Sequence, residues 1–320
     1  MKVAITDYTF ADLAIERSIL EPAGHEIVAW KEKRTAAELP ELVADADAVI
    51  TQFAPLTGEV IGRMRRAKAI VRYGIGVDNV DLAAARTKGI PVCNVPEFCI
   101  DEVADHTLAF ILAATRQVVS NCLSVRGGHW GLAVPLDRMR TLRDLTVGIV
   151  GFGRIGRAVA ARLRPFKCRV VVHDPAVPAA AIEQAECVAV ELDRLLAESD
   201  VITLHCPSTP TTRSLIDGRA IARMKRGVIL VNLARGDLVD SAALVEALTG
   251  GQVSAAALDV FSPEPIPADH PILKLPGAIV SAHISSASVR AVQTLRETAA
   301  NLAAAALRGE RLPNVVNGVG

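Results

Sequence analysis

The stretch TVGIVGFGRIGRAVAARL, residues 146–163, carries the clearest structural signal in the chain. A short β-branched run leads into Gly151, Gly153 and Gly156, and a helical pattern follows directly. Glycines at this G-x-G-x-x-G spacing allow a tight turn, a close approach of the backbone to a diphosphate, and close packing of helix on strand. The exposed amides at the helix start favour the same anion. The stretch predicts a dinucleotide-binding turn; a glycine-rich turn that only packs tightly is the alternative.

Asp174 gives this turn a partner further along the chain. It follows the strand pattern at residues 169–173, where a carboxylate can accept hydrogen bonds from an adenosine ribose and would repel a 2′-phosphate. We therefore predict NAD(H) as the ligand in preference to NADP(H). The simpler interpretation is that Asp174 only caps the next turn.

Short β-branched runs alternate with helical patterns through nearly the whole chain, which is the rhythm of βαβ units. The first set of strand patterns lies at residues 3–6, 26–29, 48–51, 69–72 and 91–94, and the second at 146–150, 169–173, 201–204, 228–232, 255–258 and 279–281. Long helices are expected at residues 101–123 and 289–307. These patterns predict an α/β protein with two doubly wound parallel sheets.

Composition limits the function classes. Of 320 residues, 51% are hydrophobic and 22% charged, which is enough apolar material for two cores. The chain has 35 Lys and Arg residues and 35 Asp and Glu residues, so its formal net charge is zero. No overall positive potential therefore favours nucleic acid or an anionic membrane as a partner. The six cysteines form no C-x-x-C pair and no cluster with histidine, so no metal site is predicted. Scattered thiols and the lack of a secretory signal pattern fit a cytoplasmic protein.

The most apolar helical pattern, residues 103–123, contains Asp105, His106 and Arg116. These side chains would be costly in lipid. We therefore expect a core helix there, and no membrane span.

Three later segments carry charged side chains at predicted strand ends: VNLARGDLVD (231–240), ALDVFSPEP (257–265) and SAHISSAS (281–288). Sheets of this type bind ligands at the carboxyl ends of their strands. The segments supply the guanidinium of Arg235, the carboxylates of Asp259 and Glu264, and the imidazole of His283. Arginine matches a carboxylate with a planar fork of donors, and histidine gives and takes a proton near neutral pH.

Together these groups suit hydride addition to a 2-oxo acid, in which the ketone oxygen also needs a proton. A carboxylate such as Glu264 beside His283 would favour the imidazolium form. Taken singly, the arginine would be interpreted as a solvated surface charge and the histidine as a structural one. The joint pattern behind a dinucleotide turn seldom arises by chance, and it favours the catalytic interpretation.

The chain resembles the D-isomer-specific 2-hydroxyacid dehydrogenase family, and especially its branch similar to the C-terminal binding proteins. The resemblance extends over nearly the whole length. The segments that carry it are VRYGIGVDNVDL (71–82), GIPVCNVPEFCIDEVADHTL (89–108), VGIVGFGRIG (147–156), LHCPSTPTTR (204–213), MKRGVILVNLARGDLVD (224–240), AAALDVFSPEP (255–265) and His283.

The resemblance implies a role for each site residue. Arg235 binds and polarises the substrate, and His283, paired with Glu264, acts as acid and base. The implied cofactor contacts are Gly151, Gly153, Arg154, Ile155, Gly156, Asp174, Cys206, Pro207 and, beside the nicotinamide, Asp259. The implied substrate loop is Tyr73, Gly74, Ile75 and Gly76. In physical terms, Gly74 and Gly76 can expose successive amides as an anion nest for the substrate carboxylate, or can simply form a turn.

The resemblance also implies how the chain is divided. A Rossmann-type NAD-binding domain at residues 100–287 is inserted in a flavodoxin-like substrate-binding domain made of residues 1–99 and 288–320. Family members are usually homodimers joined through their NAD-binding domains, so the helix 101–123 and the arm 126–143 are expected at that interface. A D-2-hydroxy acid is the expected product.

Around His283 the chain departs from the family pattern. Ala282 stands where a proline is common, and small residues follow at 285–288 where a glycine or an aromatic is frequent. The substrate therefore stays open among glyoxylate, hydroxypyruvate, other short 2-oxo acids and phosphorylated or bulkier analogues, as does the physiological direction. Arg72 and Lys31 could face a second anionic group or be solvated charges.

A second class of protein also stays open. A corepressor similar to the C-terminal binding proteins would use NAD(H) as a conformational ligand, would bind a short peptide, and would keep the same acid and base residues. The chain shows no long disordered extension and no basic patch, which favours the enzyme.

Overall fold

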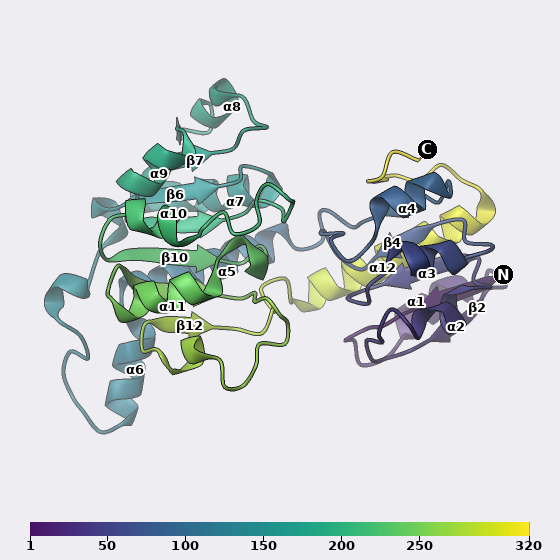
Figure 1. Cartoon of the computed structure of the whole chain (residues 1–320), viewed down its shortest axis with the longest axis horizontal. Coiled ribbons are helices and arrows are strands. Elements are labelled where there is room, and N and C mark those ends of the chain that lie inside the picture. The colour runs from purple at the N-terminus through teal and green to yellow at the C-terminus, as the bar shows by residue number, and fades with distance from the viewer. Residues whose placement is uncertain (320) are drawn as a thin grey trace. The chain divides into compact units, whose positions relative to one another are not determined.

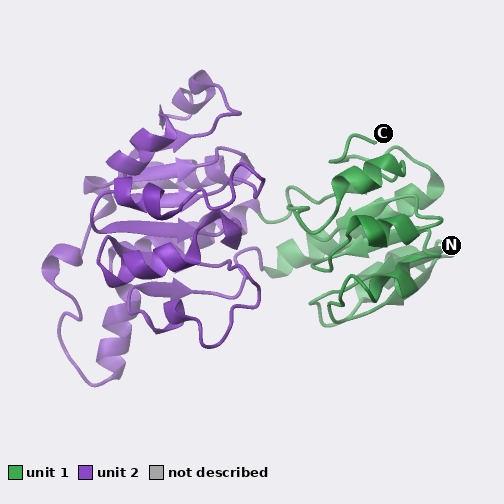
Figure 2. Cartoon of the chain, in the orientation of Figure 1, with its two compact units in different colours: residues 1–99, 288–320 green, residues 100–287 purple. Residues whose placement is uncertain are grey.

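The computed structural model describes residues 1–319 and divides the chain into two compact units (Figures 1 and 2). Unit 1 consists of Met1–Cys99 and Ser288–Gly320, and unit 2 of Ile100–Ala287. Each unit has a purely parallel sheet between helices, so the predicted fold class of two doubly wound parallel sheets is confirmed.

Unit 1 contains a five-stranded sheet of order β2-β1-β3-β4-β5, which is the flavodoxin-like order. Its strands are β1 Lys2–Ile5, β2 Glu26–Ala29, β3 Ala48–Thr51, β4 Ile70–Arg72 and β5 Val92–Cys93. Its helices are α1 Ala14–Leu20, α2 Leu39–Val43, α3 Gly58–Arg63, α4 Leu82–Thr87 and α12 Val289–Arg308.

The two faces of this sheet have separate cores, because successive strand residues point to opposite sides. Val3 and Ile5 pack in the core that α1 and α12 supply, whereas Ala4 between them packs with residues of α2, α3 and α4. Helix α12, yellow in Figure 1, covers β3 and β4 and so completes the unit that the first residues begin.

Unit 2 contains a seven-stranded sheet of order β12-β11-β10-β9-β6-β7-β8. Its strands are β6 Thr146–Val150, β7 Arg169–His173, β8 Val188–Ala189, β9 Val201–Leu204, β10 Val228–Asn232, β11 Val253–Leu258 and β12 Ala278–Val280. Its α-helices are α5 Ile100–Thr115, α6 Val118–Arg126, α7 Arg154–Leu163, α8 Ala179–Glu183, α9 Leu192–Glu198, α10 Gly218–Arg223 and α11 Ser241–Thr249. Its 3-10 turns are η1 Leu136–Arg138, η2 Leu142–Asp144, η3 Arg164–Phe166, η4 Gly236–Leu238 and η5 Pro271–Lys274. The strand order reverses between β6 and β9, which is where sheets of this kind bind ligands.

Three details differ from the sequence-based expectations. Strand β8, a two-residue strand at the edge of the sheet, was not predicted. Helix α3 was also missed; it is six residues long and begins after Thr57, whose hydroxyl accepts the Val60 amide at 3.4 Å. The helix expected at 101–123 is the pair α5 and α6, bent by 63°, because Gln117 between them is left-handed with φ of 51°.

Within residues 1–319, no single helix is long and apolar enough to cross a membrane, although α5 and α6 would pass that test as a bent pair.

Candidate functional site

The glycine turn follows β6 at the point where the strand order of unit 2 reverses. Gly151 has a φ of +95°, and a Cβ on it would lie 2.6 Å from backbone atoms of His205 and Cys206. A Cβ on Gly156 would lie 2.1 Å from the carbonyl oxygen of Gly151. A Cβ on Gly153, in contrast, would meet nothing within 4 Å. The fold of the turn requires the first and last glycines, while Gly153 leaves space open where a ligand can approach.

The start of α7 and Asp174 complete this side of the site. Arg154 and Ile155 begin the ten-residue helix, and its N-cap, Gly153, has no side chain to cap the first amides. Asp174 accepts the Phe152 amide at 2.7 Å and the Ala176 amide at 2.8 Å, which fixes its carboxylate beside the turn. A fixed carboxylate, an open glycine and a helix start without a side-chain cap fit a dinucleotide such as NAD.

The residues after β9 form an uncharged wall beside the turn. The His205 amide donates to the Val150 carbonyl at 2.7 Å and holds this segment against Gly151. Burial lowers the pKa of His205 to about 4 and raises the pKa of Cys206 to about 11. At neutral pH the imidazole is therefore neutral and the thiol keeps its proton, so Cys206 is not a reactive thiolate. Pro207 follows at the surface.

The turn after β10 fixes Arg235. Fully buried Asn232 donates to the carbonyl oxygen of Arg235 at 2.8 Å and accepts the Ala234 amide at 3.0 Å. The Nη1 atom of Arg235 donates to the Ala234 carbonyl at 2.7 Å. A Cβ on Gly236 would lie 2.0 Å from the carbonyl carbon of Phe261, so only glycine permits this contact. The loops after β10 and β11 are thus held together.

Glu264 and His283 form a partly exposed pair. The Oε2 atom of Glu264 lies 2.8 Å from Nδ1 of His283, and its Oε1 atom accepts the Phe261 amide at 2.8 Å. The two side chains are 33% and 27% exposed. Burial raises the pKa of Glu264, but the hydrogen bond and charge of His283, the Phe261 amide and the charge of Arg235 outweigh it and hold the pKa below its ordinary value.

Two consequences follow for the chemistry of this pair. Glu264 is ionised at neutral pH, and a carboxylate can only accept, so Nδ1 of His283 carries the shared proton. The Nε2 atom is then the one that can exchange a proton with a substrate.

Asp259 holds the turn on which His283 lies. Its fully buried carboxylate accepts the Ser281 hydroxyl and the amides of Ile284 and Ser285, each amide at 2.9 Å. Its carbonyl oxygen accepts the His283 amide at 2.7 Å. His283 has a φ of +52°, a conformation that needs such support. The structure therefore gives Asp259 a positioning role, and its contact with the nicotinamide stays a prediction.

The loop of residues 73–76 lies in unit 1, and the structure corrects two expectations for it. The side chain of Tyr73 is 1% exposed and its hydroxyl donates to Glu16 at 3.0 Å, so it is unavailable to a substrate. Strand alternation explains this, because Tyr73 and Val71 face the same core. The amide of Gly74 donates to the Arg72 carbonyl at 2.8 Å, so it is not free to join an anion nest.

The amides of Ile75 and Gly76 form the part of the predicted nest that remains. The Gly74 carbonyl accepts the Val95 amide at 2.9 Å, and the Ile75 carbonyl accepts Nδ2 of Asn94 at 2.7 Å. The C=O and N–H of a trans peptide point in opposite directions. The amides of Ile75 and Gly76 therefore both point away from residues 94–95, and they form a candidate site for an anion.

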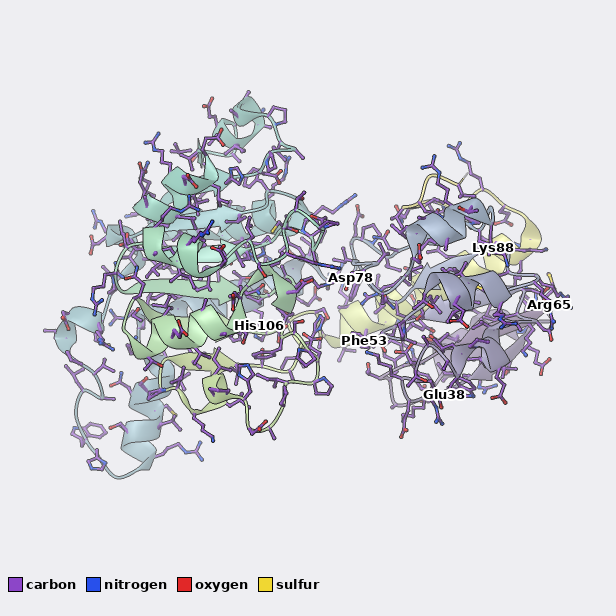
Figure 3. All side chains as sticks on the ribbon, in the orientation of Figure 1. Glu38, Phe53, Arg65, Asp78, Lys88 and His106 are labelled. Carbon is purple, nitrogen blue, oxygen red and sulfur yellow. The ribbon has the colours of Figure 1, made fainter. Side chains whose placement is uncertain are left out.

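A cation lies beside this loop. The guanidinium of Arg72 is over the Phe53 ring, 5.8 Å from its centroid, and a Cβ on Gly74 would be 1.2 Å from its Nη1 atom. Gly74 is therefore needed for this packing. Figure 3 shows Phe53 and Asp78, which follow β3 and β4, at one end of unit 1, with Arg65 at the other.

The predicted residues thus fall into two groups. Unit 2 brings together the glycine turn with Asp174, and places Arg235, Glu264 and His283 on loops after the neighbouring strands β10, β11 and β12. Unit 1 holds the loop of residues 75–76. Sequence reasoning missed Asn232, for which the letters NLAR after a strand are the available signal, and it missed Glu16 because glutamate in a short helix is ordinarily solvated.

One protein family and several known proteins are similar to this chain. Residues 108–285 match the model described as D-isomer specific 2-hydroxyacid dehydrogenase, NAD binding domain. The chain is 40% identical over 291 residues to the D-3-phosphoglycerate dehydrogenase of Mycobacterium tuberculosis, covering 91% of this chain and 54% of that protein. It thus spans about half the length of that relative.

Two further relatives match along nearly their whole length. The chain is 37% identical over 308 residues to the glyoxylate reductase of Korarchaeum cryptofilum, covering 94% of this chain and 93% of that protein. The crystal structure of D-lactate dehydrogenase from Aquifex aeolicus, complexed with NAD and lactic acid, superposes with a TM-score of 0.87 at 29% identity, over 97% of this chain and 96% of that one.

Proposed function

This chain belongs to the D-isomer specific 2-hydroxyacid dehydrogenase family and contains its NAD-binding domain, and from that premise we propose that it interconverts a small 2-oxo acid and its D-2-hydroxy acid with NAD(H). The observation that carries the proposal is the pair of Glu264 and His283, with the charge of Arg235 acting on the same carboxylate. A fixed cation and a proton donor are the two groups that reduction of a 2-oxo acid requires.

Each residue has a distinct task in the proposed reaction. NAD(H), when bound, supplies or takes the hydride at C2. Arg235 binds the substrate carboxylate through parallel donors, and its charge polarises the neighbouring ketone. His283 gives a proton from Nε2 to the C2 oxygen in reduction and takes it back in oxidation, while Glu264 holds Nδ1 and stabilises the imidazolium.

The loop in unit 1 is a proposed binding element for a carboxylate of the substrate. The amides of Ile75 and Gly76 supply two donors, and the cation of Arg72 beside Gly74 adds a favourable field. Lys31, by contrast, is exposed and lies over the ring of Tyr8, 5.9 Å from its centroid.

Asp174 supports a preference for NAD(H) over NADP(H). Its carboxylate is fixed by two backbone amides and would repel a 2′-phosphate. Catalytic efficiency with NADPH comparable to that with NADH would contradict this part of the proposal.

A homodimer is the proposed assembly. Exposed apolar side chains are concentrated on α6 and the arm that follows it, including Leu123 at 64%, Trp130 at 94% and Leu136 at 73% exposure. Large apolar patches of this kind mark protein interfaces, and the resemblance assigns this segment to a second copy of the chain. Equilibrium sedimentation should show a dimer that Trp130→Ser with Leu136→Ser shifts toward monomer; a wild-type monomer at micromolar concentration would refute it.

The experiment that tests the activity is NADH oxidation with a panel of glyoxylate, hydroxypyruvate, pyruvate and a phosphorylated 2-oxo acid. Wild-type turnover that Arg235→Ala and His283→Ala both lose supports the proposal and ranks the acids. Tight NADH binding with no turnover on any acid would instead favour the NAD(H)-sensing binding module.

A further inference from the structure

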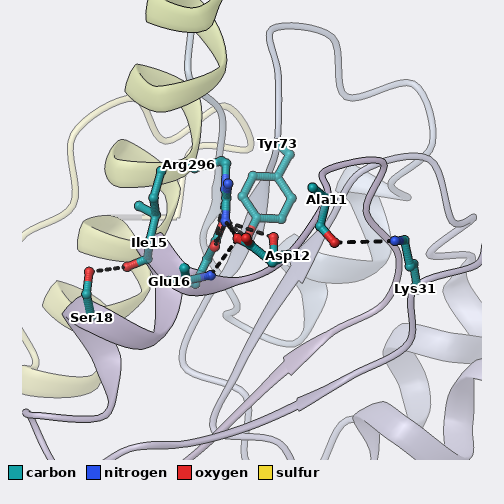
Figure 4. Close-up of polar contacts among 9 residues, drawn as sticks. Ala11, Asp12, Ile15, Glu16, Ser18, Lys31, Tyr73 and Arg296 are labelled. Atoms are coloured by element: carbon teal, nitrogen blue, oxygen red, sulfur yellow. Dashed lines mark hydrogen bonds and ion pairs between the residues drawn. The ribbon is translucent and has the colours of Figure 1, made fainter.

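Glu16 and Arg296 form a buried ion pair in unit 1 that the proposed chemistry does not use (Figure 4). The side chain of Glu16, on α1, is 0% exposed, and that of Arg296, on α12, is 9% exposed. The Nη2 atom of Arg296 lies 2.7 Å from Oε2 of Glu16, and its Nε atom lies 2.9 Å from Oε1. This is the two-pronged geometry in which arginine binds a carboxylate most strongly.

Tyr73 is the third member of this network. Its hydroxyl donates to Oε1 of Glu16 at 3.0 Å. The ring of Phe10 meets the Tyr73 ring edge-on, with centroids 5.3 Å apart, and lies 4.9 Å from the guanidinium of Arg296. Burial, together with the charge and hydrogen bond of Glu16, raises the pKa of Tyr73 well above its ordinary value, so the phenol keeps its proton. Both the ring and the hydroxyl of Tyr73 are therefore fixed.

The network ends where the substrate loop begins. The Tyr73 amide donates to the Thr51 carbonyl at 2.8 Å, which extends the pairing of β3 and β4 by one residue. Beyond it, the loop is held through its backbone: the Gly74 amide donates to the Arg72 carbonyl, the Gly74 carbonyl accepts the Val95 amide, and the Ile75 carbonyl accepts the Asn94 side chain. The Tyr73 hydroxyl thus anchors the loop at its first residue through that residue's own side chain. Because a buried ion pair is an inefficient way to stabilise a fold, a role in positioning accounts for it better than packing alone.

We propose that the Glu16–Arg296 pair is a positioning device for the reaction: it fixes Tyr73 and thereby the direction of the Ile75 and Gly76 amides that receive the substrate carboxylate. The inference rests on the proposed function, which assigns this loop to substrate. Since α1 belongs to the first segment of unit 1 and α12 to the second, the loop reaches its binding geometry only when both segments are folded together.

Two variants and one matched control test this inference. Tyr73→Phe removes only the hydroxyl, and Glu16→Gln removes the charge but keeps an acceptor. Asp47→Asn is the control, because Asp47 is also a buried carboxylate of unit 1, 6% exposed and 2.9 Å from Arg66. It precedes β3, at the amino end of the parallel strands, whereas the loop follows the carboxyl end of β4. The readouts are KM and kcat for the preferred 2-oxo acid, the Kd for NADH, and hydrogen exchange of the amides of residues 74–77.

Tyr73→Phe and Glu16→Gln should raise KM about tenfold, the size expected for one hydrogen bond to a charged group, and should leave kcat within about twofold because His283 is untouched. Exchange at residues 74–77 should become faster, and NADH affinity should not change. Asp47→Asn should lower the melting temperature and should leave KM, kcat, the Kd for NADH and hydrogen exchange at residues 74–77 unchanged. If Tyr73→Phe lowers stability but keeps the wild-type KM and the wild-type hydrogen exchange at residues 74–77, the inference is overturned.

Failure of the proposed function would be seen separately. If the wild-type protein reduces no 2-oxo acid, the activity is disproved, and hydrogen exchange then decides the positioning claim by itself. Faster exchange at residues 74–77 in Tyr73→Phe but not in Asp47→Asn supports it, and equal exchange in the two variants overturns it.

Discussion

Each unit contains one ion pair that matters for the proposed function, and the two pairs differ in exposure. Glu264 and His283 in unit 2 are about one-third and one-quarter exposed, whereas Glu16 and Arg296 in unit 1 are almost fully buried. A partly exposed pair can exchange a proton with a substrate, and a buried one can only hold its neighbours in place. The difference supports our proposal that the chemistry belongs to unit 2 and the positioning of a binding loop to unit 1.

The largest effect is expected for His283, whose proposed acid–base role is the chemistry assigned to unit 2. His283→Ala should lower kcat by about 10³-fold, within the range of general acid–base catalysis, and should leave NADH affinity unchanged because the glycine turn is intact. Steady-state kinetics and fluorescence titration measure the two quantities. Retention of a tenth of kcat in His283→Ala would break the assignment.

A smaller effect is expected where charge is kept but geometry is lost. Arg235→Lys should lower kcat/KM by about 10²-fold, because an ammonium group cannot offer two parallel donors to a carboxylate. Arg219→Lys, on the exposed surface of α10, should change nothing. Full activity in Arg235→Lys would show that only the charge at this position matters.

Acid should destabilise unit 2 through His205. Because its pKa falls from 6.5 to about 4 in the folded protein, only the unfolded chain takes up this proton between those values. The contribution of His205 to the free energy of unfolding is therefore fully present above pH 6.5. It is lost as the pH falls toward 4, which lowers the free energy of unfolding by about 1–3 kcal/mol. The free energy of unfolding, measured with denaturant and plotted against pH, should have a shallower slope in His205→Gln than in the wild type. An unchanged slope would contradict this expectation.

The smallest effects are expected in the glycine turn, where one glycine is predicted to matter for NADH binding and another for the stability of the fold. Gly153→Ala meets no atom within 4 Å and should keep the wild-type melting temperature while weakening NADH binding about tenfold. Gly156→Ala should lower the melting temperature, since its Cβ would overlap the Gly151 carbonyl. Equal NADH affinity in Gly153→Ala and wild type would place the diphosphate elsewhere.

The sequence predicted what depends on local pattern. The strands of unit 2 follow from buried apolar runs such as Val228–Asn232. The pairing of Glu264 with His283 is the one that the family resemblance implied, and the two side chains lie 2.8 Å apart. The bend at Gln117 could not be predicted, since neither glycine nor proline marks it. The orientation of Tyr73 could have been read from the alternation along β4.

The buried network of unit 1 lay outside local patterns altogether. Glu16 and Arg296 are separated by 280 positions in the chain. Each taken singly is an ordinary charged residue of a helix, and only the packing of α1 against α12 brings them together. Long-range pairs of this kind require a structure.

The most direct test of the account follows the hydride itself. NADH carrying deuterium on the transferable position of its nicotinamide is incubated with the protein and the preferred 2-oxo acid, and the product is examined by mass spectrometry and chiral chromatography. We predict a D-2-hydroxy acid with deuterium at C2, formed in an amount equal to the NADH consumed, and no such product with His283→Ala. Tight NADH binding with no labelled product from any acid would contradict it.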